Sequence, residues 1–308
     1  MKTYSRILTL LLAVGLLICS VPVSAEEQSS LEQDYSAIDY YSGMTYSDYY
    51  DKYRDTIRPE NDIKLDSLDI VSIQNIKIEE KDDSHQNAVY FTQDEGFVEF
   101  NAQVPEGIYH LEITYIAEQN NHSELEVSVM IDGEYPFDDS QAISLSRVWM
   151  DSTTIKQDEN DNDILPIQQE TNFWRSEKLI NKQGFYKEPY IFYFSGGMHK
   201  IRITSGQTNI ILAGIRLCND PDPQSYSEYR STITSKEKGK RVFHEAEQTY
   251  IKSDSTLYPT IDRSSSKSSP ADPVKLKYNT IGQSNFSHVG EWITWKVDVD
   301  KSGNYNIS

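Results

Sequence analysis

Apolar and polar residues alternate along much of this chain, and one alternating unit occurs twice. The first copy covers residues 96–111 and the second covers residues 291–307. In both copies the alternation stops at a glycine-centred turn and then resumes. A two-residue period on either side of such a turn predicts a half-buried hairpin in an antiparallel sheet. The matched positions are Phe97 with Trp292, Phe100 with Trp295, Val104 with Val299 and Gly107-x-Tyr109 with Gly303-x-Tyr305.

The same alternation predicts many further short strands. Turn residues separate several of them, including Asp132-Gly133 and Gly196-Gly197. Short strands at this spacing indicate a β-sandwich or jelly roll. The predicted strands cover residues 70–73, 76–78, 89–92, 97–104, 109–117, 125–131, 190–194, 199–204 and 210–217.

A short tyrosine-rich motif precedes each β region. Tyr46-Ser-Asp-Tyr49 stands before the first and Tyr226-Ser-Glu-Tyr229 before the second. Apolar residues at near-helical spacing predict a helix over residues 34–56. We expect its tyrosine stripe to pack on a neighbouring domain and not to bind a ligand.

The amino terminus has the three parts of a secretory signal peptide. Basic residues precede the apolar run Ile7–Ile18, and Val23-Ser-Ala25 forms a cleavage site. The apolar run is too short for a permanent membrane span, which needs ~20 residues. We therefore expect an exported chain with no membrane span in its mature form, found outside the cell or at the bacterial cell surface. Only Cys218 remains after cleavage, so no disulfide forms within the chain.

These observations predict an all-β chain of tandem jelly-roll β-sandwiches with short helical lead-ins, the second sandwich being cut off at Ser308. The predicted parts are a signal peptide (1–25), a helical lead-in (26–60), a first galactose-binding-like sandwich (61–220), a helix and linker (221–240) and a partial second sandwich (241–308).

Net charge and motif content exclude several classes of partner and of catalytic site. The chain has 29 basic and 48 acidic residues, a formal net charge of −19. Nucleic acid and anionic membranes are therefore poor partners, because binding phosphate needs a cationic surface. The sequence contains no Gly-x-Ser-x-Gly elbow, no glycine-rich phosphate loop and no Cys-x-x-Cys pair. His244-Glu-Ala-Glu-Gln248 begins like a zinc-protease helix but lacks the second histidine. We therefore expect no catalysis in this segment.

Two glutamates open the second β unit. Strand alternation would place Glu245 and Glu247 on one face, where their oxygens suit Ca²⁺. Spacing alone favours a solvated pair of surface carboxylates.

Residues 243–247, 290–295 and 302–305 resemble the Glu-Ala-Glu strand and the Gly-x-Trp-x-x-Trp to Gly-x-Tyr hairpin of carbohydrate-binding modules with the galactose-binding-like jelly roll. That resemblance implies a structural Ca²⁺ held by Glu245 and Glu247. The first β unit has no Glu-x-Glu at the equivalent place.

The whole arrangement also resembles the amino-terminal region of large extracellular solute-binding proteins of bacterial ABC sugar transporters. Residues 104–109, Arg147-x-Trp149 and Glu188-Pro-Tyr190 carry much of this likeness. It implies an oligo- or polysaccharide ligand, and an ABC permease as partner through sequence beyond Ser308.

Aromatic residues are the candidate sugar contacts. In the second unit, alternation places Trp295 in the core and Trp292 on the opposite face, where it either stacks on a sugar or is covered by its own domain. The sequence is least regular over residues 147–181. The predicted ligand-binding residues are Trp149, Trp174, Tyr186 and Tyr190 in or beside that stretch, and Trp292. Two alternatives stay open: an accessory region of a secreted glycoside hydrolase or lyase, and a structural spacer or adhesin stalk.

Overall fold

The structure is a computed structural model that describes residues 43–307 apart from residues 84, 86, 119–123, 208–209, 222, 234–240 and 266. The predicted signal peptide and the first part of the predicted helix lie outside the described residues. The described residues from Met44 onward belong to one compact unit. No helix among the described residues has the length and apolar character needed to span a membrane.

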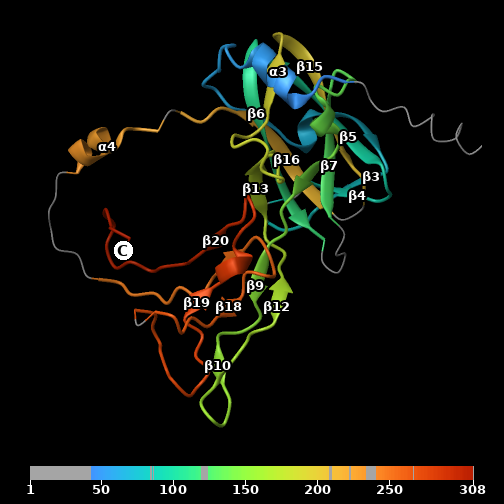
Figure 1. Cartoon of the computed structure of the whole chain (residues 1–308). Helices are drawn as coiled ribbons and strands as arrows, with labels where there is room; N and C mark the ends of the chain where they lie inside the picture. Colours follow the sequence, from blue (N-terminus) through green and yellow to red (C-terminus); the bar gives the residue numbers. More distant parts are fainter. Residues whose placement is uncertain are drawn as a thin grey trace, which may run out of the picture. The chain divides into compact units, whose positions relative to one another are not determined.

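Two antiparallel sheets form the main body of this unit (Figure 1). The larger has seven strands: β1 (Ile63–Leu65), β3 (Ile76–Glu79), β4 (Ala88–Phe91), β6 (Gly107–Ala117), β13 (Arg175–Lys178), β14 (Ile191–Phe194) and β16 (Ile210–Cys218). The smaller has five, in the order β2 (Ile70–Gln74), β5 (Gly96–Val104), β15 (Gly197–Ser205), β7 (Leu125–Ile131) and β8 (Ile143–Leu145).

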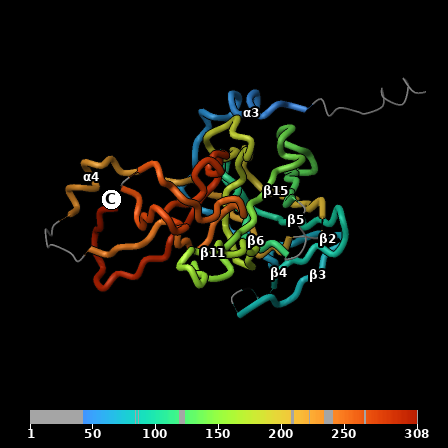
Figure 2. Tube along the Cα trace, turned by 60° about the horizontal axis from the view of Figure 1, so that its bottom comes forward, coloured from blue at the N-terminus to red at the C-terminus, as the bar shows by residue number. Residues whose placement is uncertain are grey.

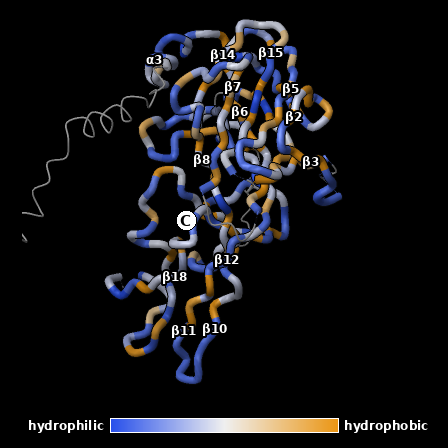
Figure 3. Tube along the Cα trace, turned by 90° about the vertical axis from the view of Figure 1, so that its right-hand side faces the viewer, coloured by the Kyte–Doolittle hydropathy of each residue, from blue (hydrophilic) through white to orange (hydrophobic). Residues whose placement is uncertain are grey.

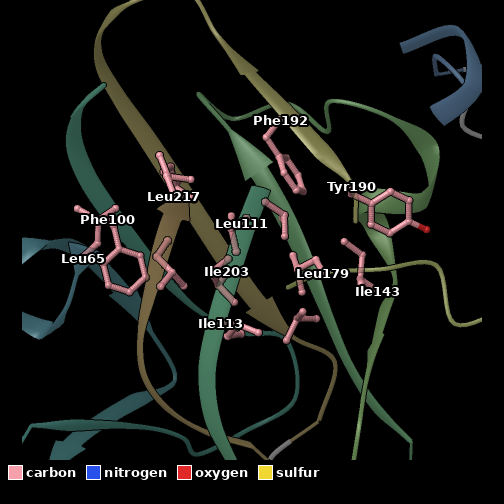
Figure 4. Close-up of a cluster of buried hydrophobic side chains, with 14 of the residues drawn as sticks. Leu65, Phe100, Leu111, Ile113, Ile143, Leu179, Tyr190, Phe192, Ile203 and Leu217 are labelled. Carbon is pink, nitrogen blue, oxygen red and sulfur yellow. The ribbon is translucent and has the colours of Figure 1, made fainter. Parts of the chain in front are cut away.

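Alternate side chains of the two sheets share one core. Figure 4 shows Leu111 and Ile113 from β6 lying among Phe100 from β5 and Ile203 from β15, and all four are fully buried. Burial of each such side chain contributes about 2 kcal/mol to folding. The predicted all-β fold is confirmed, since only two short helices and twenty strands occur among the described residues.

The predicted hairpins at Gly107 and at Gly196-Gly197 are wrong. Strand β5 belongs to the five-stranded sheet and β6 to the seven-stranded sheet, so the turn at Gly107 carries the chain from one sheet to the other. The turn between β14 and β15 does the same. Alternation identifies a strand and its buried face, but it does not specify which strand pairs with which. The tight turn predicted at Asp132-Gly133 is confirmed, with Ile131 and Glu134 exchanging backbone hydrogen bonds of 2.9 and 3.1 Å.

Helix α3 (Tyr46–Tyr53) covers one edge of the sandwich. Thr45 caps it by accepting a hydrogen bond from the Asp48 amide. The Tyr46 and Tyr49 hydroxyls accept hydrogen bonds from the amides of Ile191 and Tyr193 on β14, at 3.1 and 2.7 Å. These bonds occupy amides on the free edge of β14. The helix predicted over residues 34–56 is shorter than expected, because residues 43–45 and 54–56 are not helical. The predicted packing of its tyrosine stripe is confirmed for Tyr46 and Tyr49.

Residues 147–170 are irregular, as the sequence indicates. They contain β9 (Trp149–Asp151), β10 (Lys156–Gln157), β11 (Asp163–Ile164) and β12 (Gln168–Glu170). Figure 3 shows hydrophilic residues at the tip between β10 and β11. Three short 3-10 turns and a second helix also occur: η1 (Ser67–Asp69), η2 (Asp138–Gln141), η3 (Gln283–Asn285) and helix α4 (Tyr226–Thr232).

The described part of residues 241–307, drawn in orange to red in Figure 2, is mostly loop. Its strands are the two-residue β17 (Ile251–Lys252), β18 (Pro259–Thr260), β19 (Thr280–Ile281) and β20 (Ile293–Thr294). Strands β18 and β19 pair with each other, whereas β17 and β20 extend the β12-β9 pair into a four-stranded sheet. The second sandwich therefore stays a prediction.

Two local predictions in this segment are wrong. Glu245 and Glu247 do not lie on a strand, because the Gln248 amide donates to the Glu245 carbonyl oxygen and closes a turn. Trp295 is not in a core: 40% of its surface is exposed, and its indole N–H donates to the Ala246 carbonyl oxygen at 2.9 Å. Residues 295–307 form no strand, so these residues build no sheet that could bury Trp295.

Candidate functional site

A cleft of about 600 Å³ lies where one end of the sandwich meets the segment after β17. Its lining combines one tryptophan with charged and hydroxyl side chains. Its volume falls in the usual range for small-molecule sites, ~300–1,000 Å³. The lining includes Ser146, Arg147, Trp149, Lys182, Asp254 and Glu291.

Strand pairing places Trp149 in this cleft. Trp149 stands opposite Glu170 on β12 and Lys252 on β17, so both neighbouring strands hold its backbone. Its side chain is half-buried. The cleft therefore offers part of an indole ring on a fixed backbone.

Arg147 and Glu170 form an ion pair at the side of the cleft. Only 11% of the Arg147 side chain and 7% of the Glu170 side chain are exposed. A charge that is removed from water needs a partner of opposite sign, and each residue supplies that partner to the other. The positive charge of Arg147 in the cleft wall is therefore already neutralised by Glu170.

Glu177 and Lys182 form a second neutralised group. The Glu177 carboxylate accepts hydrogen bonds from Tyr115, the Ser146 amide and Arg175, each at 2.8 Å, and lies 3.4 Å from the Lys182 ammonium. Burial acts to raise the pKa of Glu177, but the charges of Lys182 and Arg175 and the Ser146 hydrogen bond outweigh it and lower the pKa. Burial lowers the pKa of Lys182, and the Glu177 charge opposes this shift.

Glu291 shapes the opposite wall. Its carboxylate accepts hydrogen bonds from the amides of Ser287 and His288, both at 2.8 Å, and 9% of the side chain is exposed. The loop at Gly184 packs closely on this wall, since a Cβ atom at Gly184 would lie 2.6 Å from Val289. The two walls therefore come from segments about 100 residues apart in the sequence.

The structure brings only Trp149 of the five predicted ligand residues into the cleft. Trp292 follows Glu291 directly, but the Arg175 guanidinium lies over its ring, 4.4 Å from the centroid. One indole face is therefore unavailable to a sugar. The buried Trp292 Nε1 has no hydrogen-bond partner among the described residues.

Trp174 lies elsewhere, on the outer face of the seven-stranded sheet. Its ring packs against Ile116 and Ile211, and His85 stacks on it with 3.9 Å between centroids. The indole N–H donates to the Asp82 carboxylate. Both its polar atom and one of its faces are therefore engaged within the protein.

Tyr186 and Tyr190 belong to the aromatic cluster beneath α3. Their rings meet Tyr46 edge-on, each with 4.6 Å between centroids. Tyr190 is 3% exposed and donates its hydroxyl to Asp139 at 2.7 Å; burial raises its pKa. The prediction of Tyr190 as a ligand contact is wrong, because a core side chain has no surface to offer.

Sequence reasoning missed Arg147, Lys182 and Glu291 as cleft residues. Arg147-x-Trp149 and Gly290-Glu-Trp292 both carried the family resemblance, so the motifs were visible although only the aromatic positions were selected. Lys182 had no sequence signal, since its position depends on the contact between its loop and residues 288–291.

The calcium prediction concerns a second, smaller cavity. Asp151, Thr153, Thr154, Glu247 and Thr249 line most of a space of about 120 Å³, and oxygen is the ligand that Ca²⁺ prefers. Glu247 is 3% exposed, and its pKa is raised by burial and by the nearby charges of Glu245 and Asp163. Among the described residues, however, no three His, Cys, Asp or Glu side chains form a metal-holding group. The lining offers oxygen atoms, although the Asp151 carboxylate already pairs with the Lys252 ammonium at 2.7 Å, and a Ca²⁺ site at Glu247 stays a prediction.

No protein-family model matches the chain. No curated protein matches it either. Several solved carbohydrate-binding modules resemble it in structure. A family 35 module from Clostridium thermocellum shares 13% identity over 52% of this chain and 99% of its own, with a TM-score of 0.34.

Two further modules give similar values. The C-terminal family 6 module of LamC, a laminarinase from Zobellia galactanivorans, shares 10% identity over 52% of this chain and 100% of its own, with a TM-score of 0.32. A module of Cellvibrio mixtus lichenase 5A, solved with cellotriose, shares 12% identity over 52% of this chain and 98% of its own, with a TM-score of 0.29. Because every TM-score is below 0.5, the assignment of the sandwich rests on the strand pairing itself.

Proposed function

We propose that this chain is an exported, non-catalytic carbohydrate-binding segment whose sugar site is the cleft around Trp149. The observation that carries the proposal is the cleft itself, in which a half-buried tryptophan lies among hydroxyl and charged side chains. An indole face stacks on the C–H face of a pyranose through dispersion, and the surrounding polar atoms bind its hydroxyls.

The charges of the cleft favour a neutral sugar. Glu170 already pairs with Arg147, and Glu177 already pairs with Lys182. An anionic ligand would therefore compete with buried carboxylates for these cations. A neutral polyol needs only hydrogen bonds and leaves both ion pairs intact.

The wider setting that fits this role is the amino-terminal region of a solute-binding protein of a bacterial ABC sugar transporter, with a permease as partner. The resemblance of the sequence motifs supports this setting. An accessory region of a secreted glycoside hydrolase or lyase fits the same cleft equally well. In either setting we propose that Glu247, with Glu245 nearby, holds a structural Ca²⁺.

The proposal is tested by isothermal titration calorimetry with neutral oligosaccharides, after screening on a broad glycan array. We expect Trp149→Ala to weaken binding roughly tenfold, since one aromatic stack contributes ~0.5–1.5 kcal/mol beyond burial. Trp174→Ala is the matched control, because Trp174 lies on the outer sheet face, and it should bind as the wild type does.

Binding that survives Trp149→Ala and is lost in Trp174→Ala would move the site to the outer sheet face. Folded wild-type protein that binds nothing on the array would contradict the proposal and favour the structural spacer.

A further inference from the structure

The two helices of the described chain are built alike. Each has an N-cap hydroxyl, an acidic residue three positions later, and tyrosines at the first and fourth helical positions. Thr45 accepts from the Asp48 amide in α3, and Ser225 accepts from the Glu228 amide in α4, at 3.2 and 3.3 Å. Tyr226 and Tyr229 therefore correspond to Tyr46 and Tyr49.

The environments of the paired tyrosines differ. Tyr46 and Tyr49 are 3% and 5% exposed, whereas Tyr226 and Tyr229 are 71% and 44% exposed. A helix of seven residues is marginal by itself in water, because nucleation is costly and few internal hydrogen bonds follow. Packing of an apolar face is what normally stabilises such a helix, so α4 needs a surface to cover its tyrosines.

The first β unit shows which surface that is. The chain leaving α3 lies on the turn between β5 and β6: the Ile108 amide donates to the Ile57 carbonyl oxygen at 3.0 Å, and a Cβ atom at Gly107 would lie 2.6 Å from Pro59. Tyr53 of α3 stacks on Tyr193, with 4.3 Å between centroids. The lead-in helix is thus anchored beside the Gly-x-Tyr turn of its own unit.

The second β unit has the same turn, already in contact with α4. Tyr109 donates to the carbonyl oxygen of Pro105, four residues earlier, and Tyr305 donates in the same way to Lys301, at 3.4 and 2.6 Å. Tyr229 donates its hydroxyl to the Asn304 side chain at 2.9 Å. Asn304 stands in this repeat where Ile108 stands in the first. Tyr229 of α4 therefore contacts the turn whose counterpart in the first unit is contacted by the chain leaving α3.

We propose that α4 is the docking helix of the second β unit, and that Tyr226 and Tyr229 bind the Lys301–Tyr305 turn. The partner is this chain's own β unit from Arg241 onward.

Hydrogen exchange of the full chain tests this. In the wild type we expect peptides 225–233 and 300–306 to be protected together. Tyr229→Phe should speed exchange in both peptides roughly fivefold, the effect of losing one hydrogen bond. The double change Tyr226→Ala and Tyr229→Ala should speed it more than tenfold in both, because ring packing is lost as well.

The matched control is Tyr49→Phe, which should speed exchange around α3 and the edge of β14 and leave peptides 225–233 and 300–306 unchanged. The proposal is overturned if the double alanine variant leaves exchange of peptide 300–306 at the wild-type rate. It is also overturned if peptide 225–233 is unprotected in the wild-type chain. Neither result depends on sugar binding, so this test and the glycan titration fail independently.

Discussion

Tyrosine side chains hold helix α3 against one edge of the described domain. Tyr46 combines three edge-on aromatic contacts, with Phe137, Tyr186 and Tyr190, and a hydroxyl that accepts from the Ile191 amide. Its ring supplies buried apolar area, while its oxygen satisfies a strand amide that would otherwise lack a partner. The abundance of tyrosine, 21 in this chain, thus serves packing as well as any sugar contact.

Alkaline pH should reveal this role. Burial raises the pKa of Tyr46 from 10.0 to about 12, so the folded state binds its proton more tightly than the unfolded state does. That stabilisation is complete below pH 10 and is lost as pH rises from 10 to 12, about 3 kcal/mol in all.

Urea unfolding at pH 9 to 12 measures the effect. Tyr46→Phe should be less stable at pH 9, because the Ile191 amide loses its acceptor, but its stability should fall less steeply above pH 10. Ser47→Ala, on the same helix without a titrating group, should follow the wild-type curve. If the unfolding free energies of Tyr46→Phe and the wild type fell in parallel with pH, the role given to the Tyr46 hydroxyl would be contradicted.

Turns between strands decide how the elements assemble. The turn at Gly107 connects the two sheets and lies under the chain that leaves α3. Its φ of +154° and its contacts leave no space for a Cβ atom, which would lie 2.6 Å from Pro59 and 2.8 Å from the Ile57 oxygen. The glycine is therefore required by a close backbone approach.

Gly107→Ala should lower the free energy of unfolding by roughly 2 kcal/mol or more, through steric overlap at a constrained position. Chemical denaturation measures it. Gly206→Ala is the control, because no atom lies within 4 Å of its Cβ position, and it should stay within ~0.5 kcal/mol of the wild type. Equal stability of the two variants would show that the turn can relax.

Strand positions in the first β unit followed closely from sequence, whereas strand partners did not. The predicted segment 109–117 lies within β6, and 199–204 lies within β15. The sequence nevertheless predicted that each of these two segments forms a hairpin with the preceding strand, and neither hairpin forms. An alternating strand buries the same face whether its neighbour is adjacent in sequence or distant, so local pattern carries no information on pairing.

At the scale of the whole molecule, both candidate sites are formed by segments distant in sequence. The cleft at Trp149 combines residues near 147 and 182 with residues near 254 and 291. The smaller cavity places Asp151 near Glu247. The four-stranded sheet that joins β9 to β17 brings these segments together, and the fully buried Lys252 pairs with Asp151 across it at 2.7 Å.

Calcium should stabilise this junction. With the pKa of Glu247 raised by burial, the protonated form stabilises the fold at low pH, and this contribution is lost as pH rises through the raised pKa. The charge therefore opposes folding at neutral pH, and a bound cation relieves it. We expect 1 mM Ca²⁺ to raise the melting temperature at pH 7.5 by about 3 °C or more relative to EDTA.

Glu247→Gln should be at least as stable as the wild type in EDTA and should lose the response to Ca²⁺. Glu126→Gln, at an exposed position on β7, should keep that response. A calcium shift that persists in Glu247→Gln, or one that is absent from the wild type, would exclude this site.

The candidate site was predicted only in part, because sequence does not show which residues pack over an aromatic side chain. Trp149 was selected from its irregular surroundings and lines the cleft, but Tyr190 came from the same region and is buried. Both are aromatic residues beside turns, and sequence does not distinguish an indole at a cleft from a phenol beneath a helix. Exposure depends on what packs above the residue.

The sequence alone determined the all-β class, the positions of the long strands, the tight turn at Asp132-Gly133 and the presence of a tyrosine-bearing helix, because short-range periodicity and backbone sterics control these features. The tertiary structure decided which strands share a sheet, which aromatics are buried and which polar residues meet in the cleft. Those outcomes depend on contacts between residues far apart in the chain, and no local pattern encodes such contacts.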